Sequence, residues 1–138
     1  MPPRRLAHAL GLRRARGRTT LEMIDEIRKG LPVRALYRLA SAIAPDDASF
    51  RYHIVPKATL ARRTSRLTAE ESDRLARLAG VWSVAEEVWG DARAARAFLF
   101  RAHPLLGGRK PIDVLLGTDL GARLVEDVLG RLRYGSAA

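Results

Sequence analysis

Apolar residues recur at intervals of three and four along most of this chain, which is the period of an α-helix with one buried face. No segment shows the strict alternation of apolar and polar residues that is typical of a strand. Gly, Pro and capping Thr or Asp residues separate the periodic segments. The pattern therefore predicts an all-α fold. We expect helices over residues 20–29, 32–44, 46–53, 56–66, 68–89, 91–102, 111–117 and 118–134.

The first predicted helices have clear boundaries. One helix begins near Thr19 or Thr20, with Thr20 as its expected N-cap, and Gly30 ends it. Three apolar side chains of this helix share a face. Those side chains are Leu21, Ile24 and Ile27. The next helix follows Pro32, and we expect its buried stripe to contain Val33, Leu36, Ala40 and Ile43.

Two short predicted helices, over 46–53 and 56–66, are joined by a tight turn that contains Ile54 and Val55. The second of them is basic, and this arrangement is typical of a helix-turn-helix that reads DNA. The alternative is a solvated basic helix in an ordinary bundle. On the first hypothesis the DNA-contacting side chains are Arg51, Lys57, Thr59, Arg62 and Arg63.

The longest predicted helix begins at a capping box formed by Thr68 and Glu71 and runs to about residue 89. Its apolar residues form a heptad-like seam, which either belongs to the core or pairs with a second copy of the chain. We assign four residues to this seam: Leu75, Leu78, Trp82 and Trp89.

The last third of the chain contains a Pro-Gly-Gly-Pro turn over 104–111, a one-turn helix and a final helix. Asp91 caps the predicted helix over 91–102, Thr118 caps the final helix, and Gly135 ends the final helix. We expect its apolar face to consist of Leu124, Val125, Val128, Leu129 and Leu132. These apolar residues exceed what so short a segment needs, so we interpret the last third as a surface for another protein.

The net charge of +10 is unevenly distributed. Residues 1–18 contribute +6, residues 19–66 contribute +4 and residues 67–138 contribute 0. A GC-rich genome would explain why arginine exceeds lysine, but it would not explain why the excess ends near Arg66. A basic first half and a balanced second half indicate two roles, of which the basic one faces a polyanion. Three domains follow: a basic N-terminal arm over 1–18, a helix-turn-helix domain over 19–66 and a partner-binding domain over 67–138.

Residues 1–18 contain six arginines and no acidic residue. Three hypotheses remain open for this segment: an organellar transit peptide, a flexible basic arm that follows phosphates, or a frayed terminus without function. The scarcity of serine argues against the transit peptide.

The sequence offers no catalytic or metal-binding pattern. The chain has no cysteine, and its three histidines, His8, His53 and His103, lie far apart. The run from Gly107 to Lys110 lacks the spacing of a phosphate-binding loop. We therefore expect no enzyme, cofactor or metal. The uncharged runs are too short to span a membrane, and the absence of cysteine fits a cytoplasmic protein.

Several segments together resemble the Xre/MbcA/ParS family of antitoxins. They are LTAEESDRLARL, VAEEVWGD, HPLLGGRKPIDVLL and GTDLGARLVEDVLGRLRYG, and the resemblance covers about residues 30–138. The Pro-Leu-Leu-Gly-Gly-Arg-Lys-Pro turn, followed by Thr118 and Gly121, is its most specific part. The chain departs from the family at Phe98, where Trp is frequent, and at Arg133, Ser136 and Ala137 in the tail.

The resemblance implies an Xre-like helix-turn-helix in the first half and a domain that binds a RES-domain toxin in the second half. Such toxins consume NAD or use it for ADP-ribosylation, and the C-terminal segment of the antitoxin covers the toxin's active site. It also implies a homodimer that binds operator DNA. Carried over by position, the toxin-binding residues are Leu105, Leu106, Arg109, Lys110, Arg131, Arg133, Tyr134, Gly135, Ser136, Ala137 and Ala138. The alternatives are a stand-alone helix-turn-helix regulator and a small basic RNA-binding protein.

Overall fold

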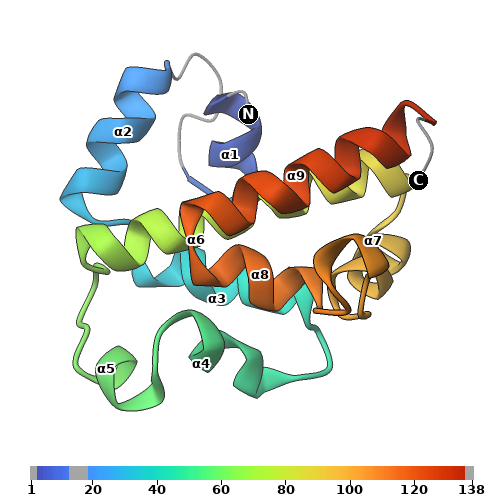
Figure 1. The fold of residues 1–138 in the computed structure, drawn as a ribbon. Coiled ribbons are helices and arrows are strands. Elements are labelled where there is room, and N and C mark those ends of the chain that lie inside the picture. Colours follow the sequence, from blue (N-terminus) through green and yellow to red (C-terminus); the bar gives the residue numbers. More distant parts are fainter. Residues whose placement is uncertain (1–2, 13–18, 136–138) are drawn as a thin grey trace. The chain divides into compact units, whose positions relative to one another are not determined.

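The structure is a computed structural model that describes residues 3–12 and 19–135. The described part is all helical, and its β-type pairing is limited to two isolated bridges, Pro32 with Arg66 and His103 with Arg109. The predicted all-α fold is confirmed (Figure 1). The described part has no helix that is long and apolar enough to cross a membrane.

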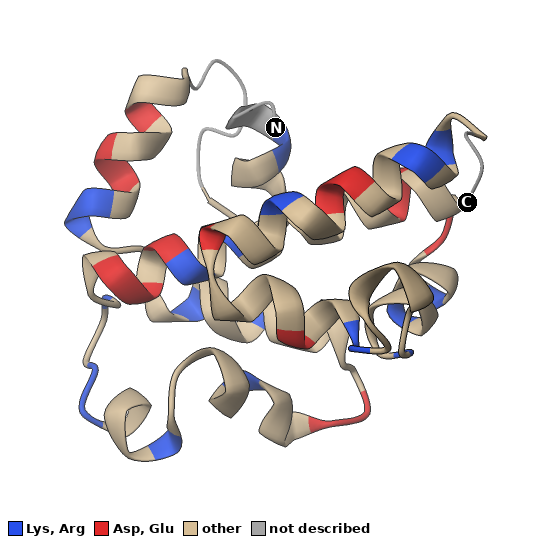
Figure 2. Ribbon diagram, in the orientation of Figure 1, with Lys and Arg blue, Asp and Glu red and all other residues tan. Residues whose placement is uncertain are grey.

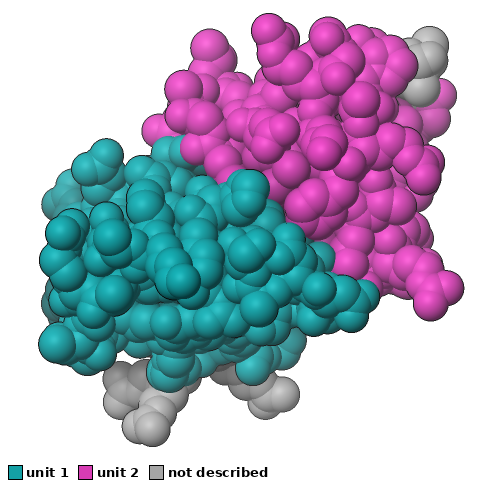
Figure 3. All heavy atoms as spheres, turned by 90° about the horizontal axis from the view of Figure 1, so that it is seen from below, with its two compact units in different colours: residues 1–79 teal, residues 80–138 magenta. Residues whose placement is uncertain are grey.

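The chain divides into two compact units, residues 1–79 and residues 80–138, which are coloured separately in Figure 3. The boundary at 66/67 stays a prediction, while the division into compact units falls inside the long helix α6 (Ala69–Trp89). The first turns of α6 belong to the first unit. There the buried Ser72 Oγ accepts a hydrogen bond of 2.7 Å from the backbone N–H of Leu31.

The first unit begins with a helix that the sequence did not predict, α1 (Pro3–Ala9). Ala7 and Leu10 are fully buried, and Leu12 is nearly so. The carbonyl of Gly11 also accepts a hydrogen bond of 2.8 Å from Arg34 Nη1. Residues 3–12 are therefore part of the folded unit and do not form a basic arm. The rest of that predicted arm, residues 13–18, lies outside the described residues.

Helix α2 (Thr20–Lys29) begins at Thr19, whose hydroxyl accepts a hydrogen bond from the N–H of Glu22, and ends at Gly30 with φ 98°. Both predicted ends are confirmed. The buried residue of α2 is Met23, whereas Leu21 is 73% exposed and Ile24 is 39% exposed. The face that carries Leu21 and Ile24 thus points away from the core of this unit.

The helices that follow are α3 (Val33–Ile43), the 3-10 turn η1 (Ala48–Phe50), α4 (Arg51–Ile54) and α5 (Lys57–Ala61). Helix α5 is shorter than the predicted 56–66. The backbone N–H of Val33 donates to the carbonyl of Ser65, and that of Leu67 donates to the carbonyl of Leu31, each at 2.9 Å. This pairing holds the segment after α5 in an extended conformation, which a continuing helix could not adopt.

Three of the four residues of the predicted seam on α6 are buried in the core. Leu75 and Leu78 are fully buried and Trp82 is 3% exposed, so these side chains leave no apolar stripe for a second chain. Trp89, at the end of α6, is different because 41% of it is exposed.

The second unit continues with α7 (Ala92–Leu99), the 3-10 turn η2 (Pro104–Leu106), α8 (Pro111–Gly117) and α9 (Asp119–Arg133). Asp91 caps α7 by accepting from the N–H of Ala94 at 2.8 Å, and Thr118 caps α9 by accepting from the N–H of Gly121 at 2.9 Å. Both predicted caps are confirmed. Val125, Val128 and Leu129 are buried as predicted, but Leu124 is 43% exposed and was wrongly placed inside.

Helices α8 and α9 pack along one another at very short range (Figure 1). A Cβ atom built on Gly121 would clash with the backbone carbonyl oxygen of Val114. Only glycine therefore fits there without moving one helix away from the other. This close approach explains why the sequence places Gly three residues after the capping Thr118.

We predict that Gly121→Ala lowers the free energy of unfolding by about 1–3 kcal/mol, because overpacking outweighs the gain in helix propensity. Gly130→Ala, in the same helix, is the matched control: a Cβ there meets nothing within 4 Å. The control is expected to stabilise α9 by about 0.5–1 kcal/mol. Denaturant unfolding of both variants measures the difference, and equal stabilities would contradict the close approach.

Candidate functional sites

The α4–α5 pair in the first unit is held by a small apolar anchor. Ile54 and Val55 are fully buried, and Leu60 is 5% exposed. Val55 is the C-cap of α4 and Pro56 is the N-cap of α5, so the connection is a two-residue turn. The pair has the tight connection predicted for a helix-turn-helix, with the remaining side chains of α5 turned outward.

Basic residues lie at both ends of α5 (Figure 2). Lys57 and Arg62 are exposed, and Thr59 is half-buried. The ammonium of Lys57 lies 5.8 Å from the centroid of the Tyr52 ring, which is within cation–π range. Lys57 and Arg62 thus keep the outward position that the sequence predicted for them, and Thr59 keeps it in part.

Arg51 has a different environment. Its guanidinium carbon lies 4.7 Å from the centroid of the Tyr37 ring, and its Nε is buried without a hydrogen-bond partner in the described part of the chain. The residue is half-buried against α3. Packing therefore fixes the stem of Arg51, and its end is less available for DNA than the sequence predicted.

Arg63 does not face outward as predicted. Its Nε and Nη2 donate hydrogen bonds of 2.8 Å each to the two carboxylate oxygens of Glu71, in the first turn of α6. The same carboxylate accepts the backbone N–H of Thr68 at 2.9 Å, which completes the predicted capping box. The Arg63 guanidinium and then the Thr68 N–H hold the pKa of Glu71 down at about 2. Arg63 thus joins the end of α5 to the start of α6.

We predict that the ion pair between Arg63 and Glu71 stabilises the protein fully only above the ordinary carboxyl pKa of about 4.5. Because the folded pKa is depressed, this stability is lost as the pH falls from about 4.5 through about 2. Glu71→Gln should lower stability by about 1–2 kcal/mol at pH 7 and flatten the acid dependence. Thermal unfolding followed by circular dichroism at pH 7, 4 and 3 measures both effects. Parallel acid curves for wild type and variant would contradict the assignment.

The turn over residues 103–111 is the first candidate surface in the second unit. The Nδ1 atom of His103 accepts the N–H of Leu105 at 3.1 Å, and Gly107 and Gly108 adopt positive φ of 65° and 80°. Leu106 is 3% exposed and anchors the turn, so it is not available to a partner as predicted. Leu105, Arg109 and Lys110 are exposed, with Leu105 at 39%.

The end of α9 is the second candidate surface. Arg131, Arg133 and Tyr134 are exposed, and Tyr134 is 78% exposed. Arg133 Nη2 forms an ion pair of 2.9 Å with Glu87 of α6, which orients the last turn. Gly135 has a φ of 64°, as expected of the residue after a helix end. The predicted tail residues Ser136, Ala137 and Ala138 lie outside the described residues.

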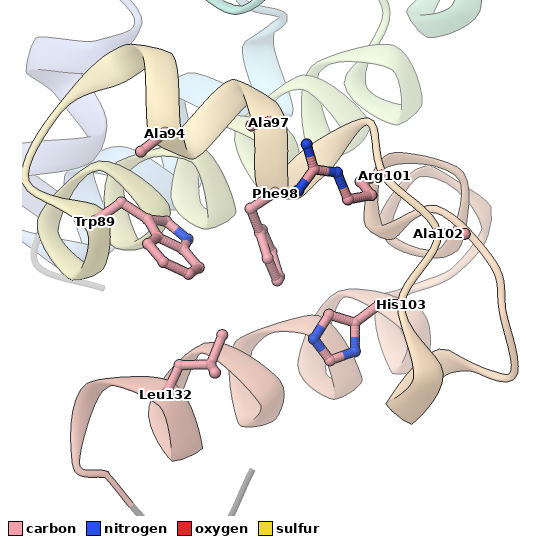
Figure 4. Close-up of a pocket in the computed structure, with 8 residues that line it drawn as sticks. All are labelled: Trp89, Ala94, Ala97, Phe98, Arg101, Ala102, His103 and Leu132. Carbon is pink, nitrogen blue, oxygen red and sulfur yellow. The ribbon is translucent and has the colours of Figure 1, made fainter.

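An apolar pocket of about 270 Å³ lies within the second unit and was not predicted. In Figure 4, Trp89 and Phe98 project toward Leu132 and His103 across it. Ala94, Ala97, Arg101 and Ala102 complete its lining. Sequence periodicity could not reveal it, because the same side chains would be expected to fill an ordinary core.

Two leucines on α9 are exposed, of which the sequence analysis did not single out Leu120 and wrongly placed Leu124 inside. Leu120 is 75% exposed, and Leu124, one turn later, is 43% exposed. They form a short apolar stripe that lies apart from the buried face of α9.

The described residues contain no group of three or more His, Cys, Asp or Glu side chains that could hold a metal ion. The exposed side chains around α5 are mainly cationic, and such groups suit the binding of a macromolecule through phosphate contacts. The two candidate surfaces of the second unit also expose aromatic and aliphatic side chains, which suit the binding of a macromolecule through apolar contacts.

Comparisons with known proteins agree with this division. Residues 22–80 match a family model described as the antitoxin Xre-like helix-turn-helix domain. Residues 84–135 match one described as the antitoxin Xre/MbcA/ParS C-terminal toxin-binding domain. A protein named antitoxin Xre from Yersinia enterocolitica is 32% identical over 137 residues, which cover 96% of this chain and 90% of that protein. Another antitoxin Xre, from Pseudomonas putida, is 36% identical over 88 residues, which cover 62% of this chain and 55% of that protein.

Proposed function

The chain belongs to the Xre/MbcA/ParS family of antitoxins, with a helix-turn-helix domain and a toxin-binding domain, and from this premise we propose that it neutralises a RES-domain toxin and represses its own operon. The toxin consumes NAD or uses it for ADP-ribosylation, and the antitoxin covers its active site. The role is regulatory and not catalytic. Because operator DNA and toxin are its two partners, the protein acts in the cytoplasm.

One observation supports the toxin-binding half of this proposal above the others. Within the segment that matches the toxin-binding domain, α9 ends in an exposed cluster of Arg131, Arg133 and Tyr134. Guanidinium groups pair with carboxylates and phosphates, and the latter are present in a nucleotide site. Arg133 is oriented by its ion pair with Glu87, and 43% of its side chain stays exposed. The tail from Gly135 to Ala138 follows this cluster directly, and its small residues suit a narrow cleft.

We predict that a chain ending after Tyr134 folds as the wild type does but no longer blocks the toxin. Size-exclusion co-elution should still show the complex, because Leu105, Arg109 and Lys110 remain. NAD consumption by the complex, followed enzymatically, should return toward that of the free toxin. Thermal unfolding of the truncated chain is the control for folding. Full inhibition by the truncated chain would contradict the proposed role of the tail.

The proposed DNA-binding half rests on the outward position of Lys57, Thr59 and Arg62 around α5. Arginine binds guanine edges bidentately, and lysine and threonine bind phosphates or bases. Arg63 is omitted from this set because Glu71 already occupies its guanidinium. Arg51 remains a candidate only through the exposed part of its side chain.

We predict that Arg62→Ala reduces operator affinity by about 1–3 kcal/mol without changing thermal stability. Arg63→Ala is the matched control from the adjacent position. It should lower the melting temperature, because it breaks the pair with Glu71. Fluorescence anisotropy with a labelled operator duplex at fixed salt gives the affinity, and unchanged binding by Arg62→Ala would remove α5 from the DNA interface.

We propose a homodimer as the operator-binding form. Since Leu75, Leu78 and Trp82 are buried within one chain, dimerisation requires another surface. Helix α2 offers one, with Leu21 and Ile24 exposed. Its first turns are acidic and its last turn is basic, so two antiparallel copies of α2 would place opposite charges together. A monomeric mass by sedimentation at micromolar concentration would contradict this proposal.

The second candidate function is a stand-alone regulator whose second unit binds no toxin. Co-purification with the cognate RES-domain protein distinguishes the two functions. A small RNA-binding protein is a third candidate, and preference for a palindromic DNA duplex over RNA would exclude it.

A further inference from the structure

The pocket between Trp89, Phe98, His103 and Leu132 is unusual for the surface of a folded unit. Large aromatic side chains are normally buried, yet Trp89 is 41% exposed at its mouth. The pocket has a volume of about 270 Å³. An engineered apolar cavity of roughly 150 Å³ is enough to bind benzene. The pocket is therefore large enough for one aromatic side chain and too small for most larger ligands.

The walls of the pocket carry an ordered set of rings. The Trp89 and Phe98 centroids lie 6.1 Å apart at an interplanar angle of 39°, and the Phe98 and His103 centroids lie 5.8 Å apart at 66°. Both spacings are typical of favourable aromatic pairs. A further ring entering from outside would extend this set in the same tilted and edge-to-face geometry. An aliphatic side chain would fill the space without those contacts.

The charged side chain in the lining of the pocket is positive. It is Arg101, which is exposed and has no ion-pair partner among the residues that the structure describes. Arg133, next to the lining residue Leu132 in α9, already pairs with Glu87 at 2.9 Å, so Arg101 supplies the charge that a ligand would meet. A ligand with carboxylates beside its ring would meet a complementary charge, and it could place the ring near the Arg101 cation as well.

The pocket is continuous with the proposed toxin-binding surface. Its wall residue His103 begins the turn that carries Leu105, Arg109 and Lys110. Its opposite wall, Leu132, lies within the cluster formed by Arg131, Arg133 and Tyr134. The whole lining falls within residues 84–135, the segment that matches the toxin-binding domain.

We propose that this pocket receives one aromatic side chain of the toxin, next to an aspartate or glutamate in the toxin's sequence. This proposal rests on the proposed function. The ring is the central anchor of the complex, and Arg101 supplies the charge at its rim. Anchors of this kind, a buried aromatic side chain within a rim of charged groups, supply most of the affinity of protein interfaces.

The first test fills the pocket from one wall. Ala97, on α7, is exposed and lines the pocket, so Ala97→Trp should occupy it with little effect on folding. We expect toxin affinity, measured by biolayer interferometry, to fall by about tenfold or more, since a lost anchor costs over 1 kcal/mol. Arg93→Trp, at an exposed position of α7 outside the lining, is the matched control and should bind as the wild type does. Equal affinity of Ala97→Trp and Arg93→Trp would overturn the proposal.

The second test identifies the occupant. Because the chain has no cysteine, Ala97→Cys introduces a unique thiol. This thiol is coupled to a short photo-crosslinker, and the labelled chain is assembled into the complete complex. The complex is then irradiated, and the crosslinked residues are identified by mass spectrometry. The expected product joins residue 97 to a toxin segment that has Phe, Tyr or Trp next to Asp or Glu. A crosslink to a second copy of this chain, to its own tail, or to a toxin segment without an aromatic residue would overturn the proposal.

The two proposals fail in different ways. If the wild-type chain forms no complex with the RES-domain toxin, both the proposed function and the pocket assignment are wrong. If the wild type binds and inhibits the toxin while Ala97→Trp does so equally well, only the pocket assignment is wrong.

Discussion

The carboxylate of Glu71 is the contact on which the first unit depends. It accepts two hydrogen bonds from Arg63 and one from the backbone of Thr68, and 7% of the residue is exposed. A carboxylate in such a place is stable only when its oxygens are fully occupied by donors. The contact fixes where α5 ends and where α6 begins. The extended segment between them can then pair with residues 31–33.

This arrangement has a consequence for function. An arginine that closes an ion pair on Glu71 is not free to approach a phosphate, so the outward basic set around α5 is smaller than its sequence suggests. The same contact gives that set a rigid base. Lys57, Thr59 and Arg62 extend from a helix whose two ends are held, by Val55 on one side and by the Arg63–Glu71 pair on the other. Rigid placement of a few side chains is what base recognition requires.

The sequence predicted the features that local rules control. Caps at Thr68, Asp91 and Thr118 follow from short-range hydrogen bonding, and all are present. The cap of α2 is Thr19, one residue before the expected Thr20. The predictions that were wrong concern residues whose position depends on tertiary contacts. Periodicity shows that Leu124 lies near an apolar face of its helix, but only the placement of α8 decides whether it is covered. Likewise, the outward or inward position of Arg63 depends on Glu71, eight residues away in the next helix.

The prediction of a basic arm at the N-terminus was wrong over residues 3–12 for a related reason. Its many arginines suggested a solvated arm, yet Ala7 and Leu10 are fully buried, because an isolated helical turn needs only a narrow apolar stripe to pack. The pocket beside Trp89 was missed for the opposite reason. Trp, Phe and Leu at helical spacing predict a filled core, and no sequence rule indicates that a pocket stays open between these side chains.

The two units differ in the surfaces that they expose, and this difference separates their partners. Residues 1–79 hold 17 Lys and Arg against 8 Asp and Glu, whereas residues 80–138 hold 8 against 7. Five of the eight exposed large apolar side chains of the described chain lie in the second unit: Trp89, Leu105, Leu120, Leu124 and Tyr134.

Excess positive charge favours a polyanion through counterion release, which needs no apolar contact. A nearly neutral surface with exposed aromatic and aliphatic groups gains little from a polyanion but much from burial against another protein. The assignment of DNA to the first unit and of a toxin to the second therefore has a physical basis that is independent of family membership.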